Sequence, residues 1–544
     1  MSVCILSAAQ MRWADMTTIE AGISGFELMD RAGRAVADAV LNCMPDFGRV
    51  VIVVGLGNNG GDGFAAARYL RIRRIPVTLV MLIPFATLRG DTLKHAELAR
   101  DAGAKLREAA SAVCFAELNR WLLRAVLVVD AVFGTGLNRP LAGGMAEAVA
   151  LINQADRPVL SVDIASGLNA DSGEVMGIAV KAAFTLPVAA SKWGYWMGAG
   201  PDYSGRLLPA AAIGVGNATL CAAWAAVADP SVCEETTALR SACFIDEDML
   251  EQAWPKRQRL AHKGSFGRVW VFGGSAGFTG APRLASLGAL AAGAGLVSVV
   301  CPDDVYPVVA AGSLEIMVHS QSSGAWMRDG DDLIEQVDAI VAGPGWGSAQ
   351  APLLAQLLTL DRPLLLDADA LNMIAADAGL QSRVRERGSL MSDKMSDHLA
   401  SDDLTAHYLT VLTPHPGEAA RLLACALSEI QADRKKAVLK LSKRYACWVV
   451  LKGNETLIAS PQGDVMLNPS GSPQLAVAGS GDVLAGMLGR QLAVCYKQGA
   501  NVGMMLGAAV GLHGEAGERS GWYLAGELAG VVAGMRQTIE RKHH

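Results

Sequence analysis

The chain has 544 residues, of which 51% are apolar, and its formal net charge is −6 at pH 7. This length predicts two domains, and the apolar content supplies a core for each of them. Because no block rich in lysine or arginine stands out, we expect neither nucleic acid nor an anionic membrane as a partner.

The cysteines and the first residues indicate the compartment. The ten cysteines stand singly, without a Cys-x-x-Cys pair, and predict reduced thiols rather than disulfides or a zinc site. No charged segment followed by an apolar core begins the chain, so we expect no signal peptide and predict a cytoplasmic location. The apolar stretches 207–227 and 281–300 contain proline and glycine, which favours buried core over membrane spans.

The first half alternates short β-branched runs with segments of helical periodicity. Strands are predicted at Val50–Val54, Val77–Leu82, Val126–Asp130 and Val159–Asp163. Helices are predicted at Gly25–Cys43, Phe64–Ile72, Asp91–Ala102 and Gly143–Gln154. This alternation predicts an α/β fold in which crossover helices connect parallel strands.

The second half repeats this organisation after a join near residues 215–245. Strands are predicted at Arg268–Phe272, Leu296–Cys301, Ala339–Ala342, Pro363–Asp367, Thr410–Thr413 and Trp448–Lys452. Helices are predicted at Leu284–Ala292 and Val483–Leu492. The polar, charged stretch Arg383–Ala406 predicts a mobile surface loop inside the second domain.

Three strand ends in the first half carry polar residues. The loop GLGNNGGDG, residues 55–63, has glycines that let backbone N–H groups approach an anion, but it also fits a plain tight turn with Asp62 as N-cap. Asp130 and Asp163 each end an apolar strand, where local N–H groups often satisfy such a carboxylate. Since ligands of open α/β sheets bind at the carboxyl ends of the strands, the three ends together favour a site. Its charge-poor oxygens suit a monovalent cation better than a divalent one.

Several motifs of the first half occur in the order found in a known family. The segments LSAAQMRWAD, GISGFELMDRAGRAVAD, GNNGGDG, VVDAVFGTG and SVDIASGL resemble the YjeF N-terminal family of NAD(P)H-hydrate epimerases. These enzymes interconvert the R and S epimers of hydrated NADH or NADPH. The resemblance implies a Rossmann-like three-layer αβα domain over residues 1–220. This sequence has Ala165 and Asn169 where the family usually has proline and aspartate.

The resemblance also implies the roles of individual residues in this domain. Asp163 is the predicted acid–base residue, because a carboxylate in a cleft can move a proton. The predicted potassium ligands are Asn59, Asp130 and Ser166. The predicted contacts to the hydrate are Asn58, Asn59, Gly60, Gly61, Asp62, Gly134, Thr135, Gly136, Leu137, Asn138, Arg139, Pro140 and Asp163.

The second half has a glycine-rich turn that suits phosphoryl transfer. Gly479-Ser480-Gly481-Asp482 precedes a helix, so its N–H groups can face a phosphoryl group and Asp482 can accept a hydroxyl proton; an N-cap aspartate is the alternative. His415 lies between two prolines, and Lys452 precedes a turn suited to nucleotide phosphates. Asp367 and Asp369 fit either a solvated turn or partners of a magnesium–water shell.

These motifs also keep the order found in a known family. AHKGSFGRV, FGGSAGFTGA, AGPGWG, DADALN, LTPHPGE, LKGNET and GSGD resemble the ribokinase-like ADP/ATP-dependent NAD(P)H-hydrate dehydratases, which implies a ribokinase-like αβα domain over residues 240–542. The implied hydrate contacts are Ala281, Gly345, His415 and Asp482. The implied nucleotide contacts are Lys452, Gly453, Asn454, Glu455, Thr456 and Gly481. Phe278-Thr279, Trp346 and Ser480 replace the usual Tyr-Pro, leucine and threonine, and residues 383–406 resemble an insertion.

The two resemblances together predict a bifunctional repair enzyme. The epimerase makes both epimers available, and the dehydratase phosphorylates the hydroxyl of the S form and eliminates phosphate. Hydrated NADH or NADPH, ADP or ATP, magnesium and potassium are the expected ligands, and a homo-oligomer is the expected state. Three alternatives stay open: an ordinary small-molecule kinase in the second half, a non-catalytic first domain, and a dehydrogenase. The glycine loop is displaced from the dinucleotide fingerprint that a dehydrogenase requires.

Overall fold

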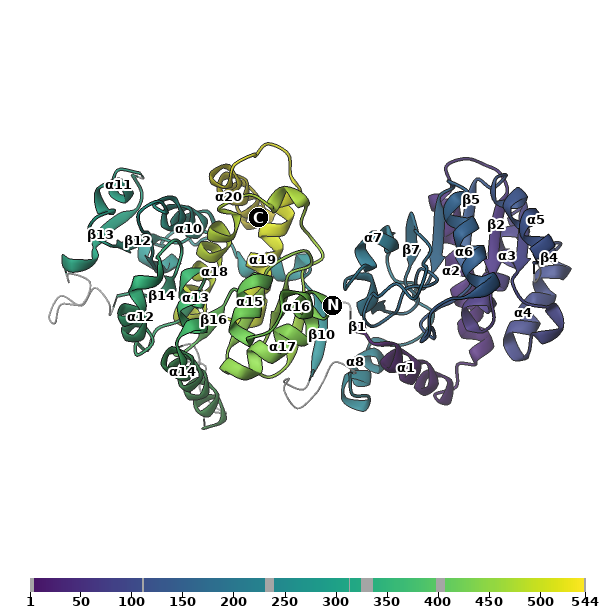
Figure 1. Cartoon of the computed structure of the whole chain (residues 1–544), viewed down its shortest axis with the longest axis horizontal. Helices are drawn as coiled ribbons and strands as arrows, with labels where there is room; N and C mark the ends of the chain where they lie inside the picture. The colour runs from purple at the N-terminus through teal and green to yellow at the C-terminus, as the bar shows by residue number, and fades with distance from the viewer. Residues whose placement is uncertain are drawn as a thin grey trace. The chain divides into compact units, whose positions relative to one another are not determined.

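The computed structural model describes residues 4–109, 112–229, 239–312, 314–323, 336–397 and 407–542 (Figure 1). The chain divides into two compact units, here called the N-terminal unit, residues 3–230, and the C-terminal unit, which contains residues 231–544. Both are α/β units, as predicted. Within the described residues, every helix is too short or too polar to cross a membrane.

The N-terminal unit is built on a parallel sheet of seven strands in the order β4-β3-β2-β5-β6-β7-β9, and β1 pairs separately with β8. The strands are β1 Ile5–Leu6, β2 Val50–Val54, β3 Val77–Met81, β4 Lys105–Glu108, β5 Leu127–Ala131, β6 Val159–Val162, β7 Phe184–Leu186, β8 Ser191–Lys192 and β9 Arg206–Leu207. The helices are α1 Ala8–Glu20, α2 Gly25–Cys43, α3 Asn58–Ile72, α4 Gly90–Asp101, α5 Ala112–Leu122, α6 Gly143–Gln154, α7 Gly200–Ser204 and α8 Asn217–Ala226.

Helices cover both faces of this sheet, so its central strands are apolar throughout. In β2, Val50, Ile52 and Val54 pack in one core with α2, α3 and α4, whereas Val51 and Val53 pack in the other core with α5 and α6. All five side chains are fully buried. A strand buried on both sides loses the alternation of polar and apolar residues, which explains the continuous valine-rich run in the sequence.

The C-terminal unit contains a mixed sheet of ten strands in the order β10-β19-β18-β17-β16-β15-β14-β11-β12-β13, antiparallel only where β18 pairs with β17 and β19. The strands are β10 Ser241–Phe244, β11 Arg268–Phe272, β12 Leu296–Cys301, β13 Met317–Ser320, β14 Ala339–Ala342, β15 Leu364–Leu366, β16 Thr410–Leu412, β17 Trp448–Leu451, β18 Leu457–Ala459 and β19 Asp464–Leu467. The helices are α9 Glu247–Ala253, α10 Gly280–Ala291, α11 Tyr306–Ala310, α12 Ala351–Leu357, α13 Asp369–Ala376, α14 Ala378–Asp397, α15 Pro416–Leu423, α16 Leu427–Ala432, α17 Arg434–Tyr445, α18 Ser480–Gln498, α19 Val502–Glu518 and α20 Ala525–Lys542.

The loop predicted at Arg383–Ala406 is wrong for its first part, because α14 continues to Asp397; residues 398–406 lie outside the described part of the chain. Leu380, Val384 and Arg387 are buried at helical spacing. The Arg387 guanidinium donates to Thr410 Oγ1 at 3.0 Å and to backbone carbonyls of residues 358–362. Because Arg387 occupies a position where an apolar residue is expected, the sequence did not show the apolar face of this helix.

The glycine-rich segment after β2 also differs from expectation, because α3 begins at Asn58 and the asparagines, glycines and Asp62 lie in its first turns. Gly57, with φ 99°, is the N-cap, so Asp62 does not cap the helix. A Cβ on Gly60 would lie 2.2 Å from the Gly55 carbonyl oxygen. Close packing of the helix on β2 thus overrides the low helix propensity of these residues.

Glycines also bring α10 and α18 together in the C-terminal unit. A Cβ on Gly486 would lie 1.7 Å from the Ala285 carbonyl oxygen, and one on Gly288 would lie 2.1 Å from the Val483 carbonyl oxygen. These contacts fix the first half of α18, the helix that carries Asp482.

We predict that Gly486→Ala destabilises the C-terminal unit by about 1–3 kcal/mol, because the added methyl group forces the two helices apart. The matched control is Gly534→Ala in α20, where a Cβ meets no atom within 4 Å. That change should stabilise by about 0.4–1 kcal/mol, since alanine restricts the unfolded chain. Denaturant unfolding measures both variants, and equal stabilities would contradict the packing described here.

Candidate active sites

The three polar strand ends of the N-terminal unit lie side by side, since β2, β5 and β6 are neighbours in the sheet. Strand order reverses between β2 and β5, the position at which open α/β sheets bind ligands, here called the crevice. The loops that follow the two strands touch there, since a Cβ on Gly55 would lie 2.2 Å from the Val132 carbonyl oxygen. The three polar strand ends selected from the sequence are thus neighbours in the sheet.

Asp163, directly after β6, is held by contacts from three other residues. Lys192 Nζ forms an ion pair with Asp163 Oδ1, and the Val188 N–H donates to the same oxygen at 3.1 Å. The Tyr195 hydroxyl donates to the Asp163 carbonyl oxygen. Asp163 adopts φ +64°, a left-handed conformation that a non-glycine residue keeps only when its surroundings enforce it. The side chains of Lys192 and Asp163 are 1% and 14% exposed, so the charged pair lies at the buried end of the crevice.

Two further carboxyl groups interact with this pair. Burial raises the pKa of Asp62 well above its usual range, and the neighbouring charges of Asp163 and Asp15 raise it further. Burial also raises the pKa of Asp15 to about 6, although Lys192 opposes that shift. The crevice thus combines a Lys–Asp ion pair with two carboxyl groups whose pKa values are raised.

The predicted potassium ligands fit a cation. Asp130 is fully buried and accepts hydrogen bonds from Ser161 Oγ at 2.9 Å, from Ser166 N at 2.8 Å and from Ser166 Oγ at 2.6 Å. No cationic side chain of the described residues forms an ion pair with it. The amide oxygen and nitrogen of Asn59 are buried without a hydrogen-bond partner, and Gly134 lies against that side chain. A bound cation would supply the positive partner that the buried Asp130 carboxylate lacks and a ligand for the unpartnered Asn59 amide oxygen.

The other predicted hydrate contacts lie on the loop after β5. Leu137 is buried, and Gly134 and Thr135 are half-buried. Four residues of this loop are exposed, namely Gly136, Asn138, Arg139 and Pro140.

In the C-terminal unit, strand order reverses between β11 and β14, and the loops after these strands meet. Gly345, at φ +58°, lies so close to α10 that a Cβ would be 2.9 Å from Ala281 Cβ. The Gly347 N–H donates to Asp369 Oδ2 at 2.8 Å. The structure thus brings together Ala281 and Gly345, two of the predicted hydrate contacts.

A buried ion pair lies beside the glycine-rich turn. Lys452 Nζ contacts Asp367 Oδ1 at 2.6 Å, and Thr413 Oγ1 donates to the same oxygen at 2.7 Å. Asp367 is therefore not part of a solvated turn. A Cβ on Gly481 would lie 3.6 Å from Lys452 Nζ, so the ammonium group faces the first turn of α18. Gly479 is the N-cap of that helix, which rules out an N-cap role for Asp482.

Several carboxylates surround the Lys452 ammonium group. Burial, followed by the negative charge of Asp367, raises the pKa of Asp482 to about 7, and Asp369 and Glu418 contribute to the shift. Burial likewise raises the pKa of Glu418 to about 7. Asp367, Glu418 and Asp482 thus place three carboxyl groups near one ammonium group. Asp367 is engaged by Lys452, whereas Asp369 accepts, among the described residues, only from the Gly347 N–H and the Asn372 amide.

His415 begins α15 and forms a capping box with Glu418. His415 Nδ1 accepts from the Gly417 N–H at 3.0 Å, and Glu418 Oε2 accepts from the His415 N–H at 2.8 Å. His415 Nε2 lies 3.3 Å from Glu418 Oε1, and half of the imidazole side chain is exposed. Burial and the positive charges of Lys452 and Arg421 lower the pKa of His415, so the ring is neutral at pH 7.

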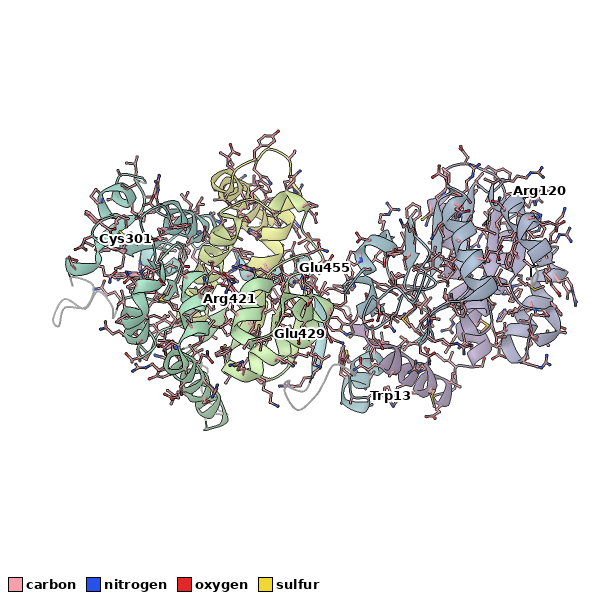
Figure 2. The ribbon with its side chains drawn as sticks, in the orientation of Figure 1. Trp13, Arg120, Cys301, Arg421, Glu429 and Glu455 are labelled. Carbon is pink, nitrogen blue, oxygen red and sulfur yellow. The ribbon has the colours of Figure 1, made fainter. Side chains whose placement is uncertain are left out.

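The predicted nucleotide loop after β17 is held by Arg434, which sequence analysis missed. The Arg434 guanidinium donates to the carbonyls of Lys452 at 3.2 Å and Glu455 at 3.5 Å, and also to Asn454. Figure 2 labels Glu455 in this loop and Arg421 in α15. Arg434 opens the charged run of α17, and nothing in the sequence of that run distinguishes it from Lys435 and Lys436.

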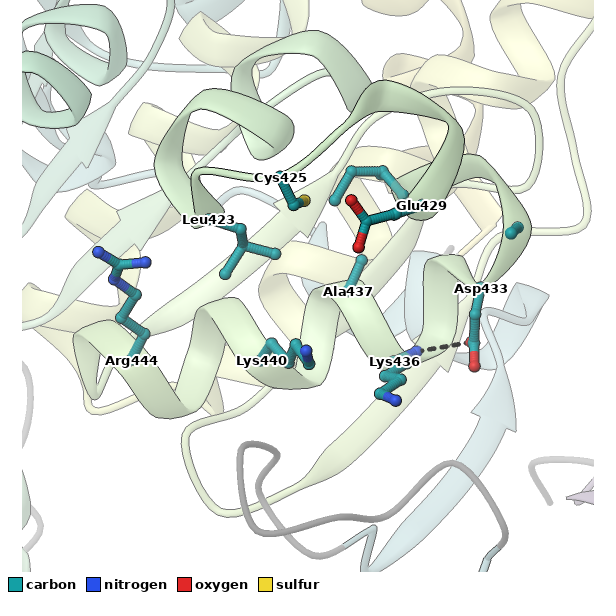
Figure 3. A pocket seen from close by; sticks show the side chains of 10 residues that line it. Leu423, Cys425, Glu429, Asp433, Lys436, Ala437, Lys440 and Arg444 are labelled. Atoms are coloured by element: carbon teal, nitrogen blue, oxygen red, sulfur yellow. Dashed lines mark hydrogen bonds between the residues drawn. The ribbon is translucent and has the colours of Figure 1, made fainter.

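A cavity of about 610 Å³ lies between α15, α16 and α17 (Figure 3). Its walls include Cys425, Glu429, Lys436 and Lys440. None of the predicted site residues lines this cavity; they lie at the strand ends.

Lys192 and Asp15 are the other residues that the sequence analysis did not select. Lys192 follows two alanines and a serine in an otherwise apolar stretch, and a lone lysine there is the only signal of a buried ion pair. Asp15 lies in α1, far along the chain from every predicted strand end. Only the fold brings these two side chains to Asp163.

The fold and the two sites define a two-unit α/β enzyme with a nucleotide-handling crevice in each unit. Residues 25–194 match the model of the YjeF-related protein N-terminus, and residues 269–389 and 393–521 match the NAD(P)H-hydrate dehydratase model. The bifunctional NAD(P)H-hydrate repair enzyme Nnr of Moorella thermoacetica is 35% identical over 95% of this chain and 92% of its own length. The enzyme of the same name from Escherichia coli is 32% identical over 87% of this chain and 81% of its own length.

The chain belongs to the family of bifunctional NAD(P)H-hydrate repair enzymes, which confirms both resemblances seen in the sequence. A crystal structure of the ADP/ATP-dependent NAD(P)H-hydrate dehydratase from Bacillus subtilis, co-crystallised with ATP and Mg²⁺, is also similar. It is 27% identical, covers 55% of this chain and 98% of its own, and has a TM-score of 0.44.

Proposed function

We propose that the N-terminal unit epimerises hydrated NADH and NADPH and that the C-terminal unit dehydrates the S epimer with ADP or ATP. We assign the first activity to residues 1–220 and the second to residues 240–542. The observation that carries the proposal is a Lys–Asp ion pair at the crevice of each unit. In the N-terminal unit this pair contains Asp163, and in the C-terminal unit it lies beside Asp482. Membership of the repair family supports dehydration over release of a stable phosphorylated product.

In the epimerase, Asp163 exchanges a proton with the hydrate. Lys192 and Tyr195 hold its carboxylate and backbone, so the group keeps one orientation in the crevice. Asn58 to Asp62 and the loop from Gly134 to Pro140 contact the hydrate. Asn59, Asp130 and Ser166 would hold potassium, which would supply a positive charge between the two loops.

In the dehydratase, Asp482 is the general base. The hydroxyl oxygen of the hydrate attacks the terminal phosphorus of the nucleotide, its proton passes to Asp482, and the shortened nucleotide leaves with the electrons of the broken P–O bond. Phosphate then leaves the ring with the electrons of the C–O bond, and a proton leaves the adjacent ring carbon. This restores the dihydropyridine. Magnesium would neutralise nucleotide phosphates near Asp369, while Ala281, Gly345 and His415 line the hydrate site.

The location and assembly of the enzyme are part of the proposal. The single spacing of the cysteines, without a Cys-x-x-Cys pair, supports a reducing, cytoplasmic location. Association into a homo-oligomer is tested by light scattering of the purified chain.

We predict that Asp482→Asn lowers the dehydration rate by roughly 10²–10⁴, the usual effect of losing a general base, and spares epimerisation. Asp163→Asn should do the reverse. Epimer exchange and recovery of the absorbance of reduced nicotinamide are measured separately on each variant. Equal damage to both activities by both variants, with unchanged melting curves, would contradict the assignment of two sites.

The dehydration rate should fall as the pH drops through about 7. Asp482 must be ionised to accept a proton, and its pKa is raised to about 7, so protonation at lower pH inactivates it. Glu418→Gln removes one negative neighbour of Asp482 and should lower the pKa of Asp482. The acidic limb of the pH–rate profile should then move toward lower pH. A kcat/KM profile that is flat between about pH 5 and 9 would exclude a base of this kind.

Potassium should accelerate epimerisation and leave dehydration unchanged. We predict that replacing potassium by tetramethylammonium slows the wild-type epimerase, because the larger ion cannot reach Asn59 and Asp130. The Asn59→Leu variant should epimerise the hydrate slowly in both the potassium and the tetramethylammonium salt. A wild-type rate that is the same in both salts would refute the cation site, and the dehydration rate serves as the control.

A further inference from the structure

Lys452 lies where the phosphoryl group would be transferred. It follows β17, and its side chain reaches past the end of β16 to Asp367 at the end of β15. The Lys452 backbone N–H donates to the Pro414 carbonyl at 2.8 Å, which fixes the start of this side chain. The Lys452 side chain is therefore held at its backbone by Pro414 and at Nζ by Asp367.

The surroundings of the ammonium group fit a transferred phosphoryl group. Nζ would lie 3.6 Å from a Cβ on Gly481, in the first turn of α18, where backbone N–H groups have no partner within the helix. Asp482, the proposed base, is the next residue. Burial disfavours the charged form of Lys452, but Asp367 and Glu418 outweigh it, so its pKa is raised and it stays an ammonium group.

We propose that Lys452 is a catalytic residue of the dehydratase and that Asp367 is its positioning residue. This inference rests on the proposed function of the C-terminal unit. The ammonium group contacts the terminal phosphoryl group of the nucleotide and neutralises the charge that develops on its oxygens. It keeps its protons throughout: the hydroxyl oxygen forms the new P–O bond, the nucleotide leaves with the electrons of the old one, and Asp482 takes the hydroxyl proton.

A role in transfer differs from a role in binding or folding alone. A lysine that only binds the nucleotide would change KM for ATP, whereas one that stabilises the transferring group changes kcat. A lysine that only compensates Asp367 would become dispensable once that carboxylate is neutralised, because the cost of breaking the pair is mainly the unpaired buried charge.

The test compares Lys452→Met, the double variant Lys452→Met/Asp367→Asn and the control Lys436→Met, all in the full chain. Lys436 lines the cavity between α15, α16 and α17 and lies outside the proposed site. We expect kcat for dehydration to fall roughly 10²–10³-fold in the first two variants, as for loss of a group that stabilises transition-state charge. Epimerisation should persist in all three, and a melting curve that keeps the unfolding transition of the C-terminal unit shows that this unit is folded.

Chemical rescue adds a second measurement. Lys452→Ala should regain part of its kcat when alkylammonium ions are added, and tetramethylammonium, which has no N–H group, should not restore it. A double variant with kcat within about tenfold of wild type, or a change confined to KM for ATP, would overturn the role of Lys452. A wild-type chain that dehydrates nothing with either nucleotide would instead overturn the proposed function itself.

Discussion

Parallel strands end on one edge of a sheet, and that constraint positions both sites. In the N-terminal unit β3 lies on one side of β2 and β5 on the other, and in the C-terminal unit β12 and β14 flank β11 in the same way. This switch in strand order marks the position at which open α/β sheets bind ligands. The chemical groups lie on the loops at these strand ends and in the first turns of helices, as Asn59 and Asp62 do in α3 and Asp482 does in α18.

Each unit meets the same electrostatic problem at its crevice. A carboxylate after a central strand, Asp163 or Asp367, is buried, and a lysine from a distant strand neutralises it. Burial disfavours charge, and hydrogen bonds from the Val188 N–H and the Thr413 hydroxyl help to satisfy the two carboxylates. Burial raises the pKa of Asp15 and Asp62 in the first unit and of Glu418 and Asp482 in the second, and Asp482 is the group proposed to accept a proton.

The sequence predicted the central strands to within about a residue, because a strand buried on both faces is a continuous apolar run. It also predicted the polar strand ends and the family. The sequence-based prediction failed where tertiary contacts replace a local signal. Arg387 occupies a core position of α14. Close packing on β2 makes Asn58 and the glycines after it helical. Lys192 carried too weak a signal, since its partner lies on another strand.

The most direct test of the account is a coupled assay on the wild-type chain. A mixture of R and S NADH hydrate is supplied with magnesium, potassium and either ATP or ADP, while the absorbance of reduced nicotinamide is followed. Two sites in one chain predict complete recovery of both epimers, faster than their spontaneous exchange. Recovery of the S epimer alone would contradict an active N-terminal site, and no recovery with either nucleotide would contradict the dehydratase.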